Sequence, residues 1–199
     1  MFKLTMSSLL ALSIVSVACG GDVRAPATAP TGELLTAADE PSENVIDLGG
    51  AVVDLPQSWT FSEPSSTMRL AEATFAGPGG PALLTVFFFG LGGGGGVEAN
   101  LERWAGQIEV AAGSEPQRDS FAVGGFTIST IAAEGTLRPS GMGAGPTEPV
   151  PGSRLLGAVI EGPGGPWFFK LTGPAETVAA AGADFDRMLR SVRPAGESV

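Results

Sequence analysis

The sequence contains no histidine and no tyrosine, and Cys19 is its one cysteine. Without histidine the chain has no imidazole for general acid–base catalysis and cannot assemble a Ser-His-Asp triad. Zinc sites that are built from histidine and cysteine are excluded for the same reason, and so is a cysteine nucleophile within the domain. Carboxylates, hydroxyls, arginines and Lys170, which is the sole lysine after Lys3, are the groups left for chemistry.

Positive charge is also scarce in this chain. It has 11 Lys and Arg against 21 Asp and Glu, which gives a net charge of −10 over 199 residues. Such a surface repels phosphate backbones and anionic lipid headgroups, so nucleic acid is a poor partner. Apolar residues make up 43%, enough to bury a sizeable core, while 30 Gly and 16 Pro favour turns and short strands over long helices.

Residues 1–18 are typical of a signal peptide. A lysine precedes an apolar segment over residues 4–17, which is shorter than the roughly 20 residues of a membrane span. The sequence SVAC that ends at Cys19 resembles a bacterial lipobox, although the position of Ser16 is usually leucine. We therefore expect a lipoprotein that carries a lipid such as palmitate on Cys19. It would be anchored in a membrane of the cell envelope, either periplasmic or surface-exposed.

The same four residues also fit an ordinary cleavage site of small residues, which would give secretion without a lipid. Lipidation explains why an exported protein carries a lone cysteine. Residues 19–44 are rich in Ala, Pro, Thr, Gly and acidic residues without periodicity, which predicts a flexible tether. A single folded domain is expected over residues 45–193, followed by a C-terminal tail at 194–199.

The pattern after residue 45 predicts an α+β domain with a mostly antiparallel β-sheet. The motif GPGGP, at 77–81 and again at 162–166, separates two apolar segments each time, and Gly124-Gly125 separates two more, so hairpins are expected. Both alternating faces of residues 83–89 are apolar, which is typical of a central strand covered on both sides. Residues 139–152 are expected to form a disordered loop.

Two amphipathic helices are expected to flank this sheet. The first covers residues 97–110, and its apolar stripe consists of Val97, Leu101, Trp104 and Ile108. The second begins near Pro174 and stops at Pro194, with its acidic residue early and its arginines late, as the helix dipole favours.

The stretch FFFGLGGGGGVEANLERW matches a dinucleotide-binding spacing at Gly90, Gly92 and Gly95. That fingerprint binds nucleotides only inside a strand–helix–strand crossover of a parallel sheet. Here a hairpin follows the helix, which predicts antiparallel pairing, and the Gly-Lys-Ser/Thr of a P-loop is missing. We interpret the glycine run as a loop and expect no nucleotide and no cofactor. Asp184 and Asp186 lack the loop spacing of a calcium site, so no metal is expected either.

One polar flank of the first helix is the candidate partner-binding surface. Asn100, Arg103 and Gln107 fall off the apolar stripe, and together with Arg69 they can line a groove for an anionic group. Ordinary helix-surface polarity is the alternative interpretation. Lys170 in WFFKL could be a buried amine of lowered pKa, but a strand residue whose tip reaches solvent is favoured.

Five segments together resemble a family of uncharacterised bacterial envelope proteins. They are LPQSW (55–59), SSTMRLAEATF (65–75), VFFFG (86–90), GGGVEANLERWAGQ (94–107) and LLGAVIEGPGGPWFFKLTGP (155–174). The L-P-x-x-W pattern and the closing hairpin plus helix also resemble the PsbP-like fold, an antiparallel sheet flanked by helices. The resemblance implies a lipoprotein or accessory subunit that binds partner proteins, and it implies no catalytic residue.

These observations predict a non-catalytic, membrane-anchored domain that binds or supports another envelope component, with an envelope protein as the expected partner. One alternative is a carboxylate-based hydrolase acting on glycans, which needs two acids facing one cleft. Another is a small-ligand carrier with an apolar pocket between the helix at 97–110 and the sheet.

Overall fold

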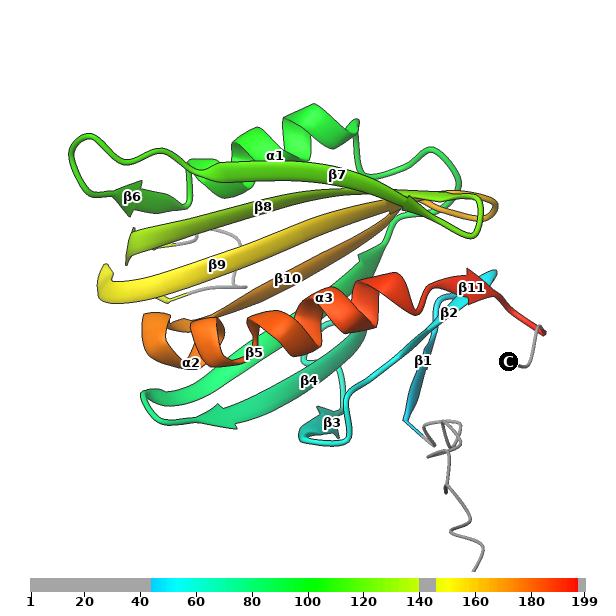
Figure 1. Cartoon of the computed structure of the whole chain (residues 1–199), viewed down its shortest axis with the longest axis horizontal. Coiled ribbons are helices and arrows are strands. Elements are labelled where there is room, and N and C mark those ends of the chain that lie inside the picture. The colour runs from blue at the N-terminus through cyan, green and yellow to red at the C-terminus, as the bar shows by residue number, and fades with distance from the viewer. Residues whose placement is uncertain (1–43, 140–145, 197–199) are drawn as a thin grey trace, which may run out of the picture. The chain divides into compact units, whose positions relative to one another are not determined.

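The structure is a computed structural model that describes residues 44–139 and 146–196. These residues form a mixed α+β domain with one large and one small sheet and three short helices (Figure 1). All strand pairings in this part of the chain are antiparallel, so the predicted α+β class and sheet type are confirmed. The expected signal peptide, Cys19 and residues 20–43 of the expected tether lie outside the described residues.

The large sheet has the strand order β3-β4-β5-β10-β9-β8-β6, and β7 also pairs with β8. Its strands are β3 (Trp59–Ser62), β4 (Arg69–Gly77), β5 (Gly80–Phe88), β6 (Ile108–Val110), β7 (Gln117–Val123), β8 (Phe126–Leu137), β9 (Val150–Glu161) and β10 (Trp167–Pro174). Hairpins β4–β5, β7–β8 and β9–β10 turn at the glycine-containing segments that predicted them. The small sheet consists of β1 (Val45–Asp47), β2 (Ala51–Asp54) and β11 (Arg193–Pro194), in the order β1-β2-β11.

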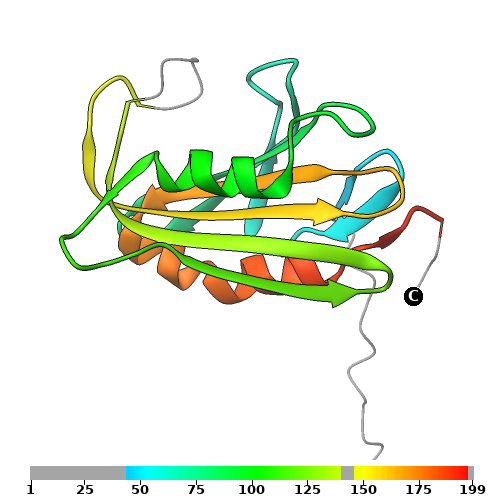
Figure 2. The ribbon, with the colours of Figure 1, turned by 90° about the horizontal axis from the view of Figure 1, so that it is seen from above.

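Helix α1 (Val97–Ala105) lies on one face of the large sheet, whereas α2 (Ala175–Ala180) and α3 (Gly182–Arg190) lie on the other (Figure 2). The first predicted helix is therefore shorter than expected. It ends at Gly106, which is a poor residue for a helix interior, and the chain continues into β6.

The second predicted helix is also different in the structure. It is divided into α2 and α3 at Ala181, and Arg193–Pro194 leave the helix to pair with β2. The predicted loop at 139–152 is too long, because β9 already begins at Val150, while residues 140–145 lie outside the described residues.

Alternation along the strands divides the buried side chains between two cores. In β10, Trp167, Phe169 and Leu171 belong to the core under α2, α3 and the small sheet, while Phe168 belongs to the core under α1. The smaller, α1 core consists of Leu101, Trp104, Ile108, Ile131, Ala133, Leu155, Val159 and Phe168. The predicted apolar stripe of the first helix thus faces the sheet, with Val97 at its margin.

Strand β5 is central in the sheet, as expected, but its α1 face is less completely covered than the opposite face. Leu84 and Val86 are completely buried, but Leu83 and Phe87, which face the α1 side, are partly exposed. Helix α1 packs over β8 and β9, and the same face of β4 and β5 is left more open. The candidate site lies at this edge of α1.

Candidate functional site

A row of polar side chains crosses three neighbouring strands beside α1. Glu72 of β4 is paired with Thr85 of β5, and Thr85 is paired with Lys170 of β10. Directly paired residues of antiparallel strands point to the same face of a sheet, so all three side chains share the α1 face. The Thr85 hydroxyl donates to the carbonyl oxygen of Lys170 at 3.2 Å.

Lys170 is the cation at the α1 end of this row. Its Nζ donates to Oε1 of Gln107, just after α1, at 3.4 Å. Burial, and then the nearby positive charges of Arg69 and Arg103, lower the pKa of Lys170 from 10.5 to about 8. The Lys170 side chain is half-buried, and the lowered pKa indicates that its amine is less solvated than that of the expected strand lysine whose tip reaches solvent.

Asn100 connects α1 to the glycine loop that precedes it. The side chain is 2% exposed, and its Nδ2 donates to the carbonyl oxygens of Gly94 and Gly96, both at 2.9 Å. Its Oδ1 accepts a hydrogen bond from Nη2 of Arg103 at 2.5 Å. Asn100 thus holds the loop and orients the guanidinium of Arg103.

Arg69 reaches the same face through a β-bulge between Arg69 and Ala71. Its Nη1 lies 2.5 Å from Oε1 of Glu72, and Glu72 also accepts hydrogen bonds from the backbone and hydroxyl of Ser65. Burial raises the pKa of Glu72, but the hydrogen bonds from Ser65 and Arg69 more than offset that effect and leave it lowered. Glu72 is therefore a carboxylate that neutralises Arg69.

We call Arg69, Arg103 and Lys170 the cationic cluster. The described residues include nine Lys and Arg side chains, and seven of them have a carboxylate within 4.0 Å. The two without such a partner in this part of the chain are Arg103 and Lys170. With Glu72 included, the cluster is locally positive in a chain whose net charge is −10. Such an arrangement favours binding of an anion.

The four residues that the sequence predicted for partner binding all lie at this site. Arg69 and Arg103 belong to the cluster, Gln107 holds Lys170, and Asn100 has a structural role because it is buried. Sequence reasoning missed Glu72 and Thr85 and placed the Lys170 amine in solvent. Alternation in WFFKL puts Lys170 on the same face as Phe168, but the pattern does not say where α1 ends above that face.

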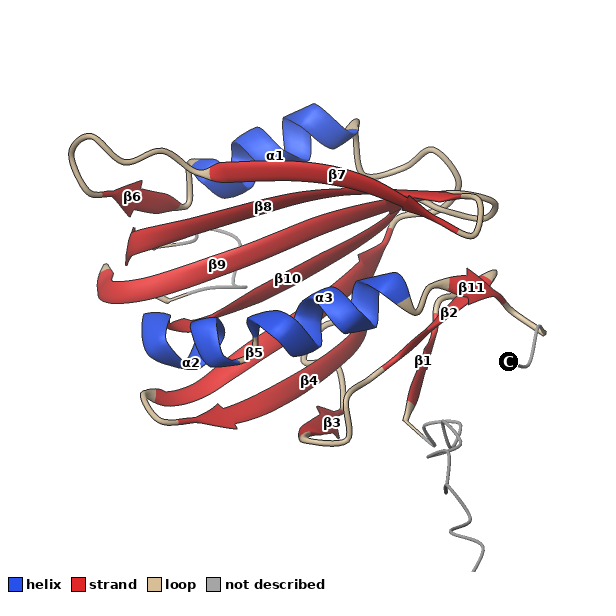
Figure 3. Cartoon of the chain, in the orientation of Figure 1, coloured by secondary structure: helices blue, strands red, loops and turns tan. Residues whose placement is uncertain are grey.

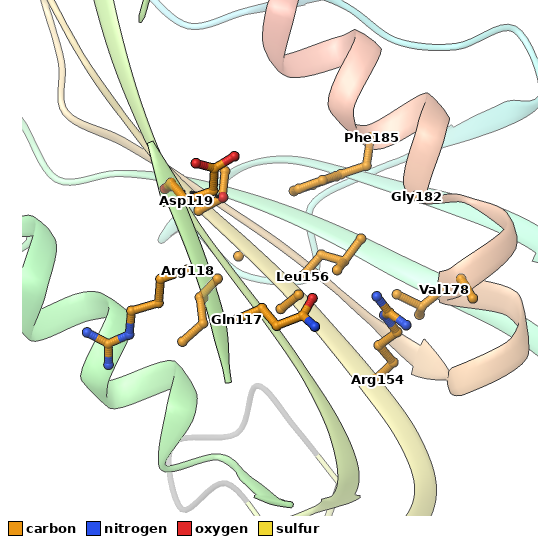
Figure 4. Close-up of a pocket in the computed structure, with 13 residues that line it drawn as sticks. Gln117, Arg118, Asp119, Arg154, Leu156, Val178, Gly182 and Phe185 are labelled. Atoms are coloured by element: carbon orange, nitrogen blue, oxygen red, sulfur yellow. Dashed lines mark hydrogen bonds between the residues drawn. The ribbon is translucent and has the colours of Figure 1, made fainter. Parts of the chain in front are cut away.

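A groove of about 470 Å³ lies on the opposite face, between β7–β9 and the α2–α3 pair (Figure 4). Leu156, Val178 and Phe185 are among its lining residues. In Figure 4 Arg118 points away from the groove toward α1, where it pairs with Glu98 and Glu102. Arg154 is paired with Glu134 at 3.3 Å. Both arginines of this groove thus already have carboxylate partners, unlike Arg103 at the edge of α1.

The sequence also suggested a glycan hydrolase and a small-ligand carrier, and the described residues do not form the expected site of either. Glu72 is the one buried carboxylate there, so the two facing acids of a glycan hydrolase are not assembled in a buried cleft. The interface between α1 and the sheet is filled by apolar side chains such as Trp104 and Phe168, where a carrier would need a pocket. No group of three or more Cys, Asp or Glu is arranged to hold a metal ion in this part of the chain.

No protein-family model matches the sequence, and no curated protein matches it either. No helix among the described residues is long and apolar enough to cross a membrane. The resemblance to envelope proteins and to the PsbP-like fold therefore stays a prediction, and the function has to be argued from the site.

Proposed function

We propose that the protein is an exported, lipid-anchored, non-catalytic domain that binds an anionic group of another envelope component at the cationic cluster. The observation that carries this proposal is the position of Arg103 and Lys170, which lie together beside Arg69 without a carboxylate partner in the described residues. The lipobox-like sequence at Cys19 and the tether that follows it support the anchor and the envelope location.

Three cations in one place repel one another, and the pKa of Lys170 is lowered first by burial and then by this repulsion. A bound carboxylate or phosphate would relieve the repulsion. The flat guanidinium of Arg103 can bind two oxygens of such a group at once, while an ammonium acts as a point charge. The cluster therefore suits a small oxyanion carried by a larger partner.

Titration of the purified full chain with inorganic phosphate tests the site. Phosphate should raise the melting temperature of the wild-type protein and raise the pKa of Lys170, since an anion favours the protonated amine. Arg103→Gln should lose most of this response. Arg187→Gln is the matched control, because it removes one positive charge from α3, on the other face of the sheet. Equal responses of the two variants would contradict the proposed site.

Crosslinking in cells tests the binding role. The wild-type chain and Arg187→Gln should capture the same envelope component, identified by mass spectrometry. Arg103→Gln and the untethered Cys19→Ser variant should capture less of it. Capture that is unaffected by Arg103→Gln would show that the partner binds elsewhere.

The groove between β7–β9 and α2–α3 supports a second candidate function, a carrier of a small ligand. Gly182 lines this groove, and its Cβ position has no neighbour within 4 Å, so Gly182→Phe would partly fill the groove. A ligand that co-purifies with the wild type and is lost from Gly182→Phe, but not from Arg103→Gln, would favour the carrier.

A further inference from the structure

Exposed apolar side chains gather beside the cationic cluster. Seven large hydrophobic residues are more than one-third exposed among the described residues, and four of them are Met68, Leu70, Phe89 and Leu91. We call these four the apolar rim. Met68 and Leu70 flank Arg69 at the start of β4, and Arg69 is paired with Phe87 near the end of β5. The two segments of the rim therefore meet at one end of the sheet.

Leu91 is the most exposed member of the rim, at 80%. The N–H of Gly93 donates to the carbonyl oxygen of Gly90 at 3.0 Å, which closes a β-turn with Leu91 at position i+1. Gly92 is at position i+2 with a φ of +68°, a positive value that favours glycine at this position of a β-turn. The hydrogen bonds from Asn100 fix the end of the same loop. The glycine run thus presents an apolar side chain on a defined turn.

The rim and the cationic cluster are continuous. Phe89 stacks on Phe87, with 6.1 Å between ring centroids, and Phe87 is the cross-strand partner of Arg69. On the other side, Asn100 binds both the glycine loop and Arg103. An anion bound at Arg103, beside the Arg69–Glu72 pair, would therefore lie next to Phe87 and Phe89.

This surface combines exposed apolar side chains with nearby positive charges. The interface of an anionic bilayer offers both an apolar region and negatively charged headgroups. There, hydrophobic groups enter the acyl region while Arg and Lys bind the headgroup phosphates. The rest of this acidic chain would be repelled by such a surface, so only an orientation that presents the cluster is favoured. A chain that is already anchored needs little additional affinity, because the anchor raises the local concentration of the domain at the membrane.

We infer that the apolar rim and the cationic cluster form one surface that docks on an anionic phospholipid bilayer. This inference rests on the proposed function and names its anionic component as the phosphate of a lipid headgroup. Leu91 and Met68 enter the interface, and the exposed Arg103 binds headgroup phosphates. Arg69, which is buried and paired with Glu72, lies beside it and is not a phosphate ligand. The docking holds the domain in one orientation on the membrane.

The test uses the full chain with Cys19→Ser, which removes the one native cysteine and allows a single fluorescent label elsewhere. Leu91→Cys, labelled with an environment-sensitive dye, reports whether the rim enters a bilayer. Ala179→Cys is the matched control, because Ala179 is exposed on α2 at the other face of the sheet. All samples share the same N-terminal segment, so a difference between the labels belongs to the domain.

With vesicles of phosphatidylglycerol and phosphatidylcholine, the label at position 91 should shift to shorter wavelength and brighten severalfold, and the label at 179 should not. Vesicles of phosphatidylcholine alone, or Arg103→Gln in the labelled chain, should reduce the effect at least severalfold. Equal changes at both positions, or an unchanged label at 91, would overturn the inference.

Titration with inorganic phosphate distinguishes a failure of the docking inference from a failure of the proposed function. If phosphate binds but position 91 stays in water, only the docking fails, and if phosphate does not bind either, the proposed site fails as well.

Discussion

At the scale of single residues, the fold places Lys170 where a positive charge is unfavourable. The amine lies at the edge of α1, and burial and the two arginines of the cluster lower its pKa to about 8. Such a residue reduces stability at neutral pH, where it stays protonated in both the folded and the unfolded chain. Binding residues are often unfavourable for stability in this way, because they are arranged for a ligand rather than for the free protein.

Lys170 should make the folded protein more stable as the pH rises from about 8 to 10.5. The unfolded chain keeps the proton up to about 10.5 and the folded chain releases it near 8, so the unfolded state binds more protons between these values. The gain is at most about 3–4 kcal/mol, since one pKa unit corresponds to about 1.4 kcal/mol. Denaturant unfolding at several pH values measures it. The chain contains no tyrosine or histidine, so the titration of these residues does not contribute to the pH dependence.

Lys170→Met supplies the control for this pH dependence. The variant should be more stable than the wild type at pH 7, and its stability should change little between pH 8 and 10.5. It should also lose the response to phosphate. A wild-type stability that is flat over this range, or a rise that persists in Lys170→Met, would mean that the amine has an ordinary pKa.

At the scale of elements, short sequence patterns predicted the features that depend on residues close together in the chain. The two GPGGP motifs and the Gly124-Gly125 pair marked the three hairpin turns, and the apolar stripe of residues 97–108 marked the buried face of α1. The exact end of that helix was not predictable from the stripe. Ile108 continues the helical spacing and is buried in the same core, but it does so from the edge strand β6.

The site itself depends on contacts that are distant in the sequence. Arg69 lies on β4, Arg103 on α1 and Lys170 on β10, and the strand order β4-β5-β10 brings the first and last together. The polar flank of α1 could be predicted from the helical spacing, and so could an anionic partner for it. The desolvated amine of Lys170 could be predicted only as the less favoured interpretation, because its desolvation depends on contacts with α1 and the arginines that the strand pattern does not contain.

Gly157→Ala should displace α1. A Cβ on Gly157 would lie 2.4 Å from Cε3 of Trp104, so the indole has to shift, and we expect α1 to move away from the sheet with it. We expect a loss of about 1–3 kcal/mol of unfolding free energy, as for other overpacked cores. The response to phosphate should weaken as well, because α1 carries Asn100 and Arg103.

Unfolding curves and a phosphate titration of the same variants check this prediction. Gly182→Ala is the control, since its Cβ would have no neighbour within 4 Å and alanine is the better helix former. It should be neutral or slightly stabilising and should bind phosphate normally. A Gly157→Ala protein that equals the wild type in both measurements would show that Trp104 has room to shift without moving the helix.

At the scale of the whole domain, the hydrophobic cores on the two faces of the large sheet differ in size. The core under α2, α3 and the small sheet contains 23 buried hydrophobic residues, whereas the core under α1 contains eight. The face with fewer buried residues is also the one that carries the cationic cluster and the apolar rim. Regions that bind ligands are often drawn from the less stable parts of a fold.

Amide hydrogen exchange in α1 should therefore be faster than in α3, although both helices have nine residues. Opening of α1 exposes the smaller core and breaks the hydrogen bonds of one buried side chain, Asn100, to the glycine loop. Because an anion at Arg103 binds only the closed form, phosphate should slow exchange in α1 and leave α3 unchanged. In Arg103→Gln, phosphate should protect neither helix. Faster exchange in α3 than in α1, or equal protection of both by phosphate, would contradict a binding face that opens independently of the larger core.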